Sequence, residues 1–126
     1  MKKRVFIPFI TLLLTVLVGC SSGSFFAIDA KENNSPNKFS MEYEKFSGHK
    51  QTKIKVSENE TVTIDADIVT NSGELDISVE RNNDDDDVFS ADDVETSAFE
   101  IVLDKEGTYI LRVDGDKHKG SYNFTW

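Results

Sequence analysis

Apolar and polar residues alternate along most of the chain after residue 38. In the clearest run, residues 62–68, four apolar positions face one way, and Thr63, Asp65 and Asp67 face the other. Strict alternation predicts a β-strand with one buried and one solvated face. The same pattern predicts six further strands, with the apolar positions Phe39, Met41 and Tyr43; Ile54 and Val56; Leu75, Ile77 and Val79; Phe99, Ile101 and Leu103; Tyr109, Leu111 and Val113; and Tyr122, Phe124 and Trp126.

Clusters of turn-forming residues separate these runs at the spacing expected of a β-sandwich. They are 47–49, 57–60, 71–73, 82–87, 105–107 and 114–118. No window shows a convincing helical stripe, and strands with one solvated face are typical of antiparallel sheets packed face to face. The sequence therefore predicts an all-β domain over residues 39–126, a small antiparallel β-sandwich of seven or eight short strands.

The first 20 residues have the layout of a secretion signal. Three basic residues, Lys2, Lys3 and Arg4, precede an apolar segment from Val5 to Val18. As a helix, this segment would reach roughly 21 Å, short of the roughly 30 Å hydrocarbon core of a bilayer. Pro8 weakens it further as a spanning helix. We therefore expect a cleaved signal and not a permanent transmembrane anchor.

The segment ends in Leu17-Val18-Gly19-Cys20, which contains the only cysteine of the chain. This tetrapeptide resembles the lipobox of bacterial lipoproteins at all four positions. The resemblance implies cleavage after Gly19, which makes residues 1–19 the signal peptide, and a diacylglyceryl group on the Cys20 thiol. Two acyl chains are enough for stable membrane residence, whereas one chain is marginal. The alternative is an ordinary signal peptide with an incidental cysteine.

Residues 20–38 are expected to form the lipidated N-terminus and a flexible tether. Residues 33–37 have the polar composition of a linker, and 18 extended residues span at most roughly 60 Å. The domain would then sit off the bilayer. Phe25, Phe26 and Ile28 interrupt this tether, and three roles are open for them: insertion into the lipid interface, docking on the domain, or none.

The end of the chain carries a second resemblance. Residues 107–115 and 120–126 follow the pattern Gly-x-Tyr-x-apolar-x-Val and then Gly-x-Tyr-x-apolar. This resembles the closing hairpin of the bacterial pre-peptidase C-terminal domain, which implies a jelly-roll-like sandwich and leaves function open. Within it, we expect Tyr109 to bury its ring and turn its hydroxyl to a nearby carbonyl. The stripe of Tyr122, Phe124 and Trp126 is either a core face or a platform for stacking sugars.

Charge narrows the range of partners. All 23 acidic residues follow Cys20, and only eleven of the 14 basic residues do, so the part after the signal has a net charge of −12. Nucleic acid is excluded as a partner, because its phosphates require a basic surface. Acidity without any specific partner is the alternative meaning of this charge.

Catalytic machinery is missing from the sequence of the domain. After Cys20 there is no thiol, and His49 and His118 both fall in predicted polar turns. No nucleophile-elbow or zinc-protease spacing occurs. We therefore predict that the protein is not an enzyme and has no cofactor.

One acidic stretch is a weak candidate for a Ca²⁺ site. Asp84, Asp85, Asp86 and Asp87 concentrate the oxygen ligands that Ca²⁺ prefers, but they lack the spacing of an EF-hand loop. A solvated loop is the alternative, with consecutive carboxylates that repel one another.

Three functional hypotheses follow. The first is a membrane-anchored bacterial lipoprotein, exposed outside the cytoplasm in the cell envelope, with a non-catalytic sandwich that binds a protein or glycan. It predicts a contiguous exposed apolar or aromatic patch. The second is a structural or immunity-type accessory lipoprotein without a small ligand, which predicts a uniformly polar surface. The third is a Ca²⁺-dependent binding module.

Overall fold

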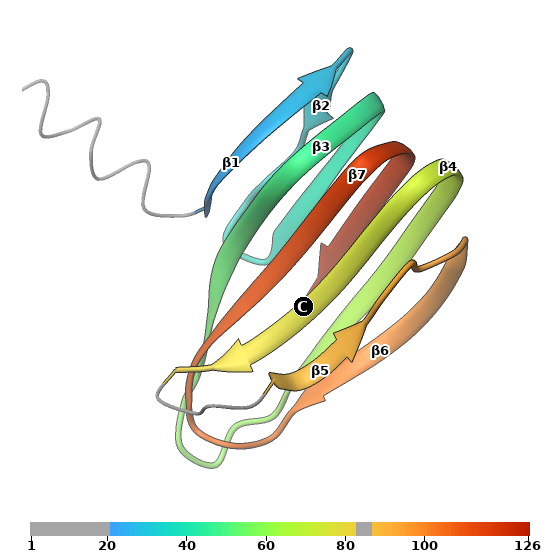
Figure 1. The fold of residues 1–126 in the computed structure, drawn as a ribbon. Coiled ribbons are helices and arrows are strands. Elements are labelled where there is room, and N and C mark those ends of the chain that lie inside the picture. The colour runs from blue at the N-terminus through green and yellow to red at the C-terminus, as the bar shows by residue number, and fades with distance from the viewer. Residues whose placement is uncertain (1–20, 83–86) are drawn as a thin grey trace, which may run out of the picture.

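The computed structural model describes residues 21–82 and 87–126, which form one sheet of seven antiparallel strands (Figure 1). The alternation of apolar and polar residues sets this architecture, because each strand buries one face and leaves the other to solvent. The strands are β1 (Ser21–Ile28), β2 (Lys31–Glu32), β3 (Lys38–Val56), β4 (Val62–Arg81), β5 (Asp87–Ala91), β6 (Ser97–Leu103) and β7 (Gly107–Thr125).

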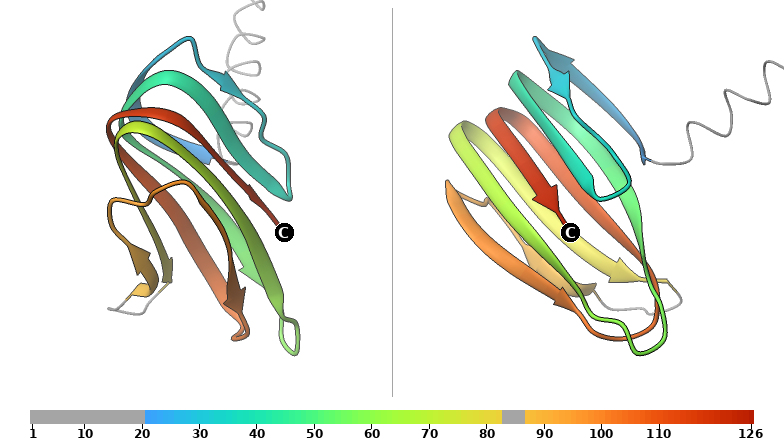
Figure 2. Two further views of the ribbon diagram at one scale, coloured as in Figure 1. Left: turned by 90° about the vertical axis from the view of Figure 1, so that its right-hand side faces the viewer. Right: turned by 180° about the vertical axis from the view of Figure 1, so that it is seen from behind.

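Three strands are long and bent. β3, β4 and β7 have 19, 20 and 19 residues, whereas strands in globular proteins seldom exceed about 10. Figures 1 and 2 show each of them arching over, so that its two halves lie in opposite layers. The front layer in Figure 1 contains β1, 48–56, 107–115, 75–81 and β5, and the back layer contains β2, 38–43, 120–125, 62–70 and β6. The all-β sandwich that the sequence predicts is confirmed.

Three of the six predicted turns are wrong. Residues 47–49, 71–73 and 114–118 are bends within β3, β4 and β7, where the pairing register shifts but the strand continues. The expected closing hairpin is therefore one bent strand whose halves lie in different layers. The register of β7 against both neighbours extends on each side of the bend, so these bends are shared by three adjacent strands.

Glycines allow the chain to bend at these positions. Gly73 has a φ of 76°, in the left-handed region that glycine adopts at little cost. At Gly115, a Cβ atom would lie 2.4 Å from Cδ2 of the Phe46 ring, which is fully buried beneath the bend. The signals that resemble turns in the sequence are thus required by a curved sheet as well.

The core fills the space between the two layers. Of the apolar positions that define the predicted strands, all are buried except Val62, Phe99 and Trp126, which are partly buried and pack against the core. Phe46, at the bend of β3, is a buried residue that the alternating pattern misses. Aromatic rings dominate one end of the core, where Tyr43, Phe46 and Tyr122 lie within 6.2 Å of one another.

The flexible tether expected for residues 20–38 is wrong for the part that the structure describes. β1 pairs with β3 over eight residues, from Ser21 opposite Thr52 to Ile28 opposite Lys45. β2 pairs with Glu42 and Met41, and the polar stretch after it forms hydrogen bonds to the start of β3. Sheet pairing satisfies backbone groups whatever the side chains are, which explains how a linker-like composition becomes ordered.

No helix in residues 21–82 and 87–126 has the length and apolar character needed to span a membrane.

Candidate functional site

The residues of the predicted lipidation site, Leu17, Val18, Gly19 and Cys20, lie outside the described residues. The next residue in the chain, Ser21, is the first of β1. Cys20 is therefore bonded directly to an edge strand of the sandwich and not to a long tether.

The candidate Ca²⁺ residues Asp84, Asp85 and Asp86 also lie outside the described residues, and Asp87 is the exposed first residue of β5. Within 21–82 and 87–126, no three histidine, cysteine, aspartate or glutamate side chains are grouped closely enough to hold a metal ion. The Ca²⁺ prediction remains untested.

His118 is fully buried at the bend of β7, although the sequence placed it in a polar turn. Its Nδ1 lies 2.6 Å from the Tyr43 hydroxyl, and its Nε2 lies 2.8 Å from Oγ1 of Thr70. The Thr70 hydroxyl donates to the carbonyl of Val94 at 2.8 Å, so it accepts from Nε2–H of His118. Nδ1 is then the acceptor for the Tyr43 hydroxyl.

This buried chain of hydrogen bonds is structural. It links the bends of β3, β7 and β4 to the connection between β5 and β6. Burial lowers the pKa of His118 and raises that of Tyr43, so both side chains stay neutral. With its imidazole enclosed in this way, His118 has no exposed surface with which to meet a substrate.

The outer face of the back layer carries a distinct set of polar residues, which we call the polar face. Side chains directly opposite one another on neighbouring strands lie on the same face of a sheet. Two rows cross β3, β7, β4 and β6 in this way: Lys38, Thr125, Asp65 and Glu100 in one, and Ser40, Asn123, Asp67 and Ala98 in the other. The polar face thus combines small polar side chains with three carboxylates towards β6 and with Lys38 on β3.

Two shallow grooves of about 490 and 410 Å³ lie on the polar face, and Asn123 lines both of them. Each falls within the range of about 300–1,000 Å³ typical of small-ligand sites. The first runs from Asn123 towards β2 and includes Ser40, Glu42 and Ser121; the second runs towards β6 and includes Asp65, Asp67 and Glu100.

The half of the polar face next to β6 has an excess of hydrogen-bond acceptors, whereas Lys31 and Lys38 line the groove next to β2. Oδ1 of Asn123 is buried and has no hydrogen-bond partner among the described residues. Asp65 lies directly opposite Glu100, an arrangement of like charges that destabilises a sheet. A ligand rich in hydrogen-bond donors would satisfy both features.

A second surface, on β1, is apolar. Phe25, Phe26 and Ile28 have exposed fractions of 40%, 60% and 42%, and we call these three residues the apolar edge. Phe25 is held in place from behind, because its ring packs on Phe46 at 5.9 Å between centroids and lies 4.7 Å from Nζ of Lys50. Of the roles considered for these residues, Phe25 at least docks on the domain.

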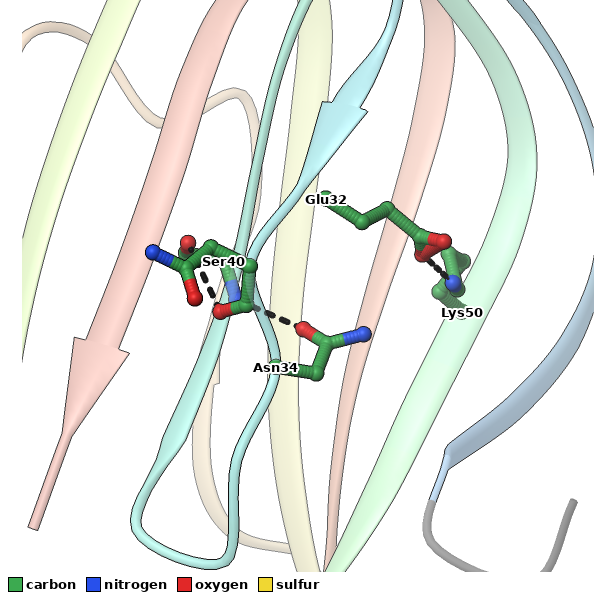
Figure 3. A network of polar contacts seen from close by, with 5 residues as sticks. Glu32, Asn34, Ser40 and Lys50 are labelled. Carbon is green, nitrogen blue, oxygen red and sulfur yellow. Dashed lines mark hydrogen bonds and ion pairs between the residues drawn. The ribbon is translucent and has the colours of Figure 1, made fainter. Parts of the chain in front are cut away.

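Lys50 connects the two layers at this edge. Its side chain is buried and forms an ion pair with Glu32 of β2, as Figure 3 shows. Burial lowers the pKa of Lys50, while the adjacent carboxylate favours the charged ammonium. Figure 3 also shows that Oδ1 of Asn34 accepts a hydrogen bond of 3.1 Å from the backbone amide of Ser40.

The aromatic stripe at the end of β7 is a core face and not a sugar platform. Tyr122 and Phe124 are buried, and Trp126 is partly buried against the core. Tyr109 behaves as predicted, because its ring is buried and its hydroxyl donates to the carbonyl of Lys105 at 2.6 Å.

Comparison with known proteins gives similarity of fold alone. No known family model matches the chain, and no curated protein matches it. The carbohydrate-binding module TmCBM61, in complex with beta-1,4-galactotriose, is 15% identical, with a TM-score of 0.46 over 82% of this chain and 81% of that chain. A family 35 carbohydrate-binding module from Clostridium thermocellum is 13% identical, with a TM-score of 0.43 over 83% and 93%.

The pre-peptidase C-terminal domain of the collagenase from Bacillus anthracis is 12% identical, with a TM-score of 0.45 over 86% of this chain and 90% of that chain. It belongs to the family that residues 107–126 resemble. At these identities and TM-scores, the similarity is one of overall architecture and does not extend to a binding site.

Proposed function

We propose that this protein is a lipid-anchored component of the bacterial cell envelope, exposed outside the cytoplasm, whose non-catalytic sandwich binds a glycan through the polar face. The observation that carries the binding proposal is the buried Oδ1 of Asn123, which lacks a hydrogen-bond partner on a side chain that lines both grooves. An unsatisfied buried acceptor costs about 1–3 kcal/mol, and a donor on a ligand removes that cost when the half-buried Asn123 side chain turns its Oδ1 into a groove.

The chemistry of the polar face favours a sugar over other ligands. Carboxylates only accept hydrogen bonds, and Asp65, Asp67 and Glu100 therefore require donors. A glycan offers many hydroxyl donors along its length, and two grooves that share one residue suit an extended chain. An envelope protein that presents lysine and arginine side chains is the alternative partner with this chemistry.

The anchoring proposal rests on Leu17-Val18-Gly19-Cys20 and on the apolar segment before it. Mass spectrometry of the native protein tests it: we expect a chain that begins at Cys20 with a diacylglyceryl adduct on its thiol. C20S is expected to leave the membrane fraction. A free thiol, or a mature chain with a different start, would refute the anchor.

Binding is tested by titrating envelope oligosaccharides into the wild-type protein and into N123A and D67N. We expect each variant to weaken binding about tenfold, the loss of one hydrogen bond to a polar ligand. D104N removes the same charge from the exposed connection between β6 and β7, away from the grooves, and is expected to bind as the wild type does. Equal affinities for D67N and D104N would place the binding site elsewhere.

The accessory hypothesis predicts a uniformly polar surface, and the apolar edge does not fit it.

The Ca²⁺ hypothesis is tested by the melting temperature of the protein in millimolar Ca²⁺, compared with Mg²⁺ at equal ionic strength. A rise specific to Ca²⁺ would favour a module that uses residues 84–87.

A further inference from the structure

Exposed apolar side chains gather on one strand. Six large apolar residues of the described chain are exposed, and Phe25, Phe26 and Ile28 of β1 are three of them. The others, Val69, Val88 and Val102, lie on three separate strands. Side chains alternate between the two faces of a strand, so Phe26 and Ile28 share the outer face of β1, whereas Phe25 points to the other side and packs on Phe46. Two neighbouring exposed apolar side chains on one face mark a candidate interaction site, whereas single exposed residues need no explanation.

The apolar edge is also an open edge of the sheet. β1 ends the strand order of its layer and pairs only with β3. An exposed edge strand with apolar side chains is a liability that proteins usually cover. Something outside the described residues is therefore needed to cover it.

The position of the first residue of β1 indicates that a lipid bilayer covers the apolar edge. Because Ser21 starts the strand, its Cα lies about 3.8 Å from that of Cys20. Six residues of extended chain then bring Phe26 to within roughly 20 Å of the predicted lipid attachment point. A lipid on Cys20 would therefore keep Phe26 within roughly 20 Å of the bilayer, close enough for the apolar edge to reach its surface when β1 lies along the membrane.

We propose that the apolar edge lies on the lipid bilayer, with Phe26 and Ile28 at the level of the headgroups. This inference rests on the proposed lipid anchor. Aromatic and aliphatic side chains partition into the interface, and they add to the hold of the acyl chains. Lys45 lies directly opposite Ile28 and supplies a charge suited to a lipid phosphate. Asp29, Glu42 and Glu44 lie near it, so the apolar side chains provide most of the contact with the bilayer.

This orientation also leaves the polar face free. β1 and β2 lie at one end of the two layers, whereas β5 and β6 lie at the other (Figure 2). With β1 on the bilayer, the sandwich stands on its edge, and the polar face on the back layer remains open to a glycan.

The test uses the protein from Cys20 to Trp126, which contains all seven described strands and the described core. Its thiol is coupled chemically to a maleimide lipid in phosphatidylcholine vesicles whose acyl chains carry bromine, a quencher of tryptophan fluorescence. In a W126F background, F26W reports on the apolar edge. V102W is the matched control, because Val102 is 57% exposed on β6 at the opposite end of the sandwich.

We expect bromine to quench about half of the fluorescence of F26W and little of that of V102W, since interfacial side chains enter the bilayer by about 5–10 Å. Equal quenching of the two variants, or none in either, would overturn the proposal. Melting curves of both variants check that the fold is intact.

Coupling by maleimide separates this inference from the anchor itself. If cells do not lipidate Cys20, mass spectrometry finds no adduct and the anchor proposal fails. The vesicle experiment still shows whether the apolar edge contacts the bilayer. The alternative is that a second copy of the chain binds the apolar edge. Sedimentation of the uncoupled protein as a stable dimer that F26D/I28D converts to a monomer would overturn the bilayer proposal.

Discussion

Two tyrosines of β7 place their hydroxyl groups in opposite surroundings. The Tyr109 hydroxyl donates to the carbonyl of Lys105, whereas the Tyr122 hydroxyl is buried without a partner in the described part of the chain. We expect Y109F to lower the free energy of unfolding by about 1 kcal/mol, and Y122F to leave it unchanged or raise it. Urea unfolding of both variants measures the difference, and equal losses would contradict the assignment.

His118 makes stability depend on pH. Its pKa is lowered by burial, so the unfolded chain binds a proton more readily than the folded one. The free energy of unfolding is therefore expected to fall as pH drops below about 6.5, the ordinary pKa of histidine. Protonation also removes the acceptor that Nδ1 offers to Tyr43.

Melting temperatures at about pH 7.5 and about pH 5.5, on either side of the ordinary histidine pKa of about 6.5, measure this effect. H118N is expected to be less stable but to lose much of the pH dependence in that range. H49Q retains the buried network and is expected to keep it. A slope that disappears in H49Q and persists in H118N would contradict the prediction.

At the scale of the elements, the ion pair of Lys50 and Glu32 holds β2 of the back layer against β3 of the front layer. E32Q leaves a buried ammonium without its counter-charge, and we expect it to cost about 1–2 kcal/mol, a value reduced because Glu32 is partly exposed. K50M replaces the charge with an apolar chain of similar size and is expected to be neutral or stabilising. Chemical unfolding of both variants provides the measurement, and a larger loss in K50M would contradict it.

Most strand interiors could be predicted from the sequence, because alternation reports directly which side chains face the core. Val62, Ile64, Ala66 and Ile68 point inward together as expected. The bends could not be predicted, since Gly48, Gly73 and Gly115 give the same signal in a turn as in a curved strand. Whether the strand reverses or continues depends on partners far away in sequence, such as Phe46 beneath Gly115.

β1 and the polar face escaped prediction for a similar reason. Phe25 and Phe26 are adjacent and break the alternation, so only pairing with β3 reveals a strand. Asn123 stands among apolar core residues in the sequence, and its place between two grooves depends on the register of β7 against β3 and β4. The burial of His118 was missed because its neighbours in sequence are polar.

At the scale of the whole molecule, net charge opposes compactness. The chain after Cys20 carries a charge of −12, and self-repulsion of this kind destabilises the folded state. Because added salt screens exposed charges, we expect the free energy of unfolding to rise by about 1 kcal/mol between low and moderate NaCl concentrations. Urea unfolding at the two salt concentrations measures the change.

Part of this repulsion is concentrated on the polar face, where Asp65 lies opposite Glu100. E100Q is therefore expected to stabilise the protein at low salt and to lose most of that advantage at high salt. E58Q removes one charge from the exposed connection after β3 and is the matched control, with a smaller gain. If salt lowered stability instead, ion pairs such as Arg112 with Asp114 would outweigh the repulsion. The polar face would then lack the electrostatic cost that a donor-rich ligand is proposed to relieve.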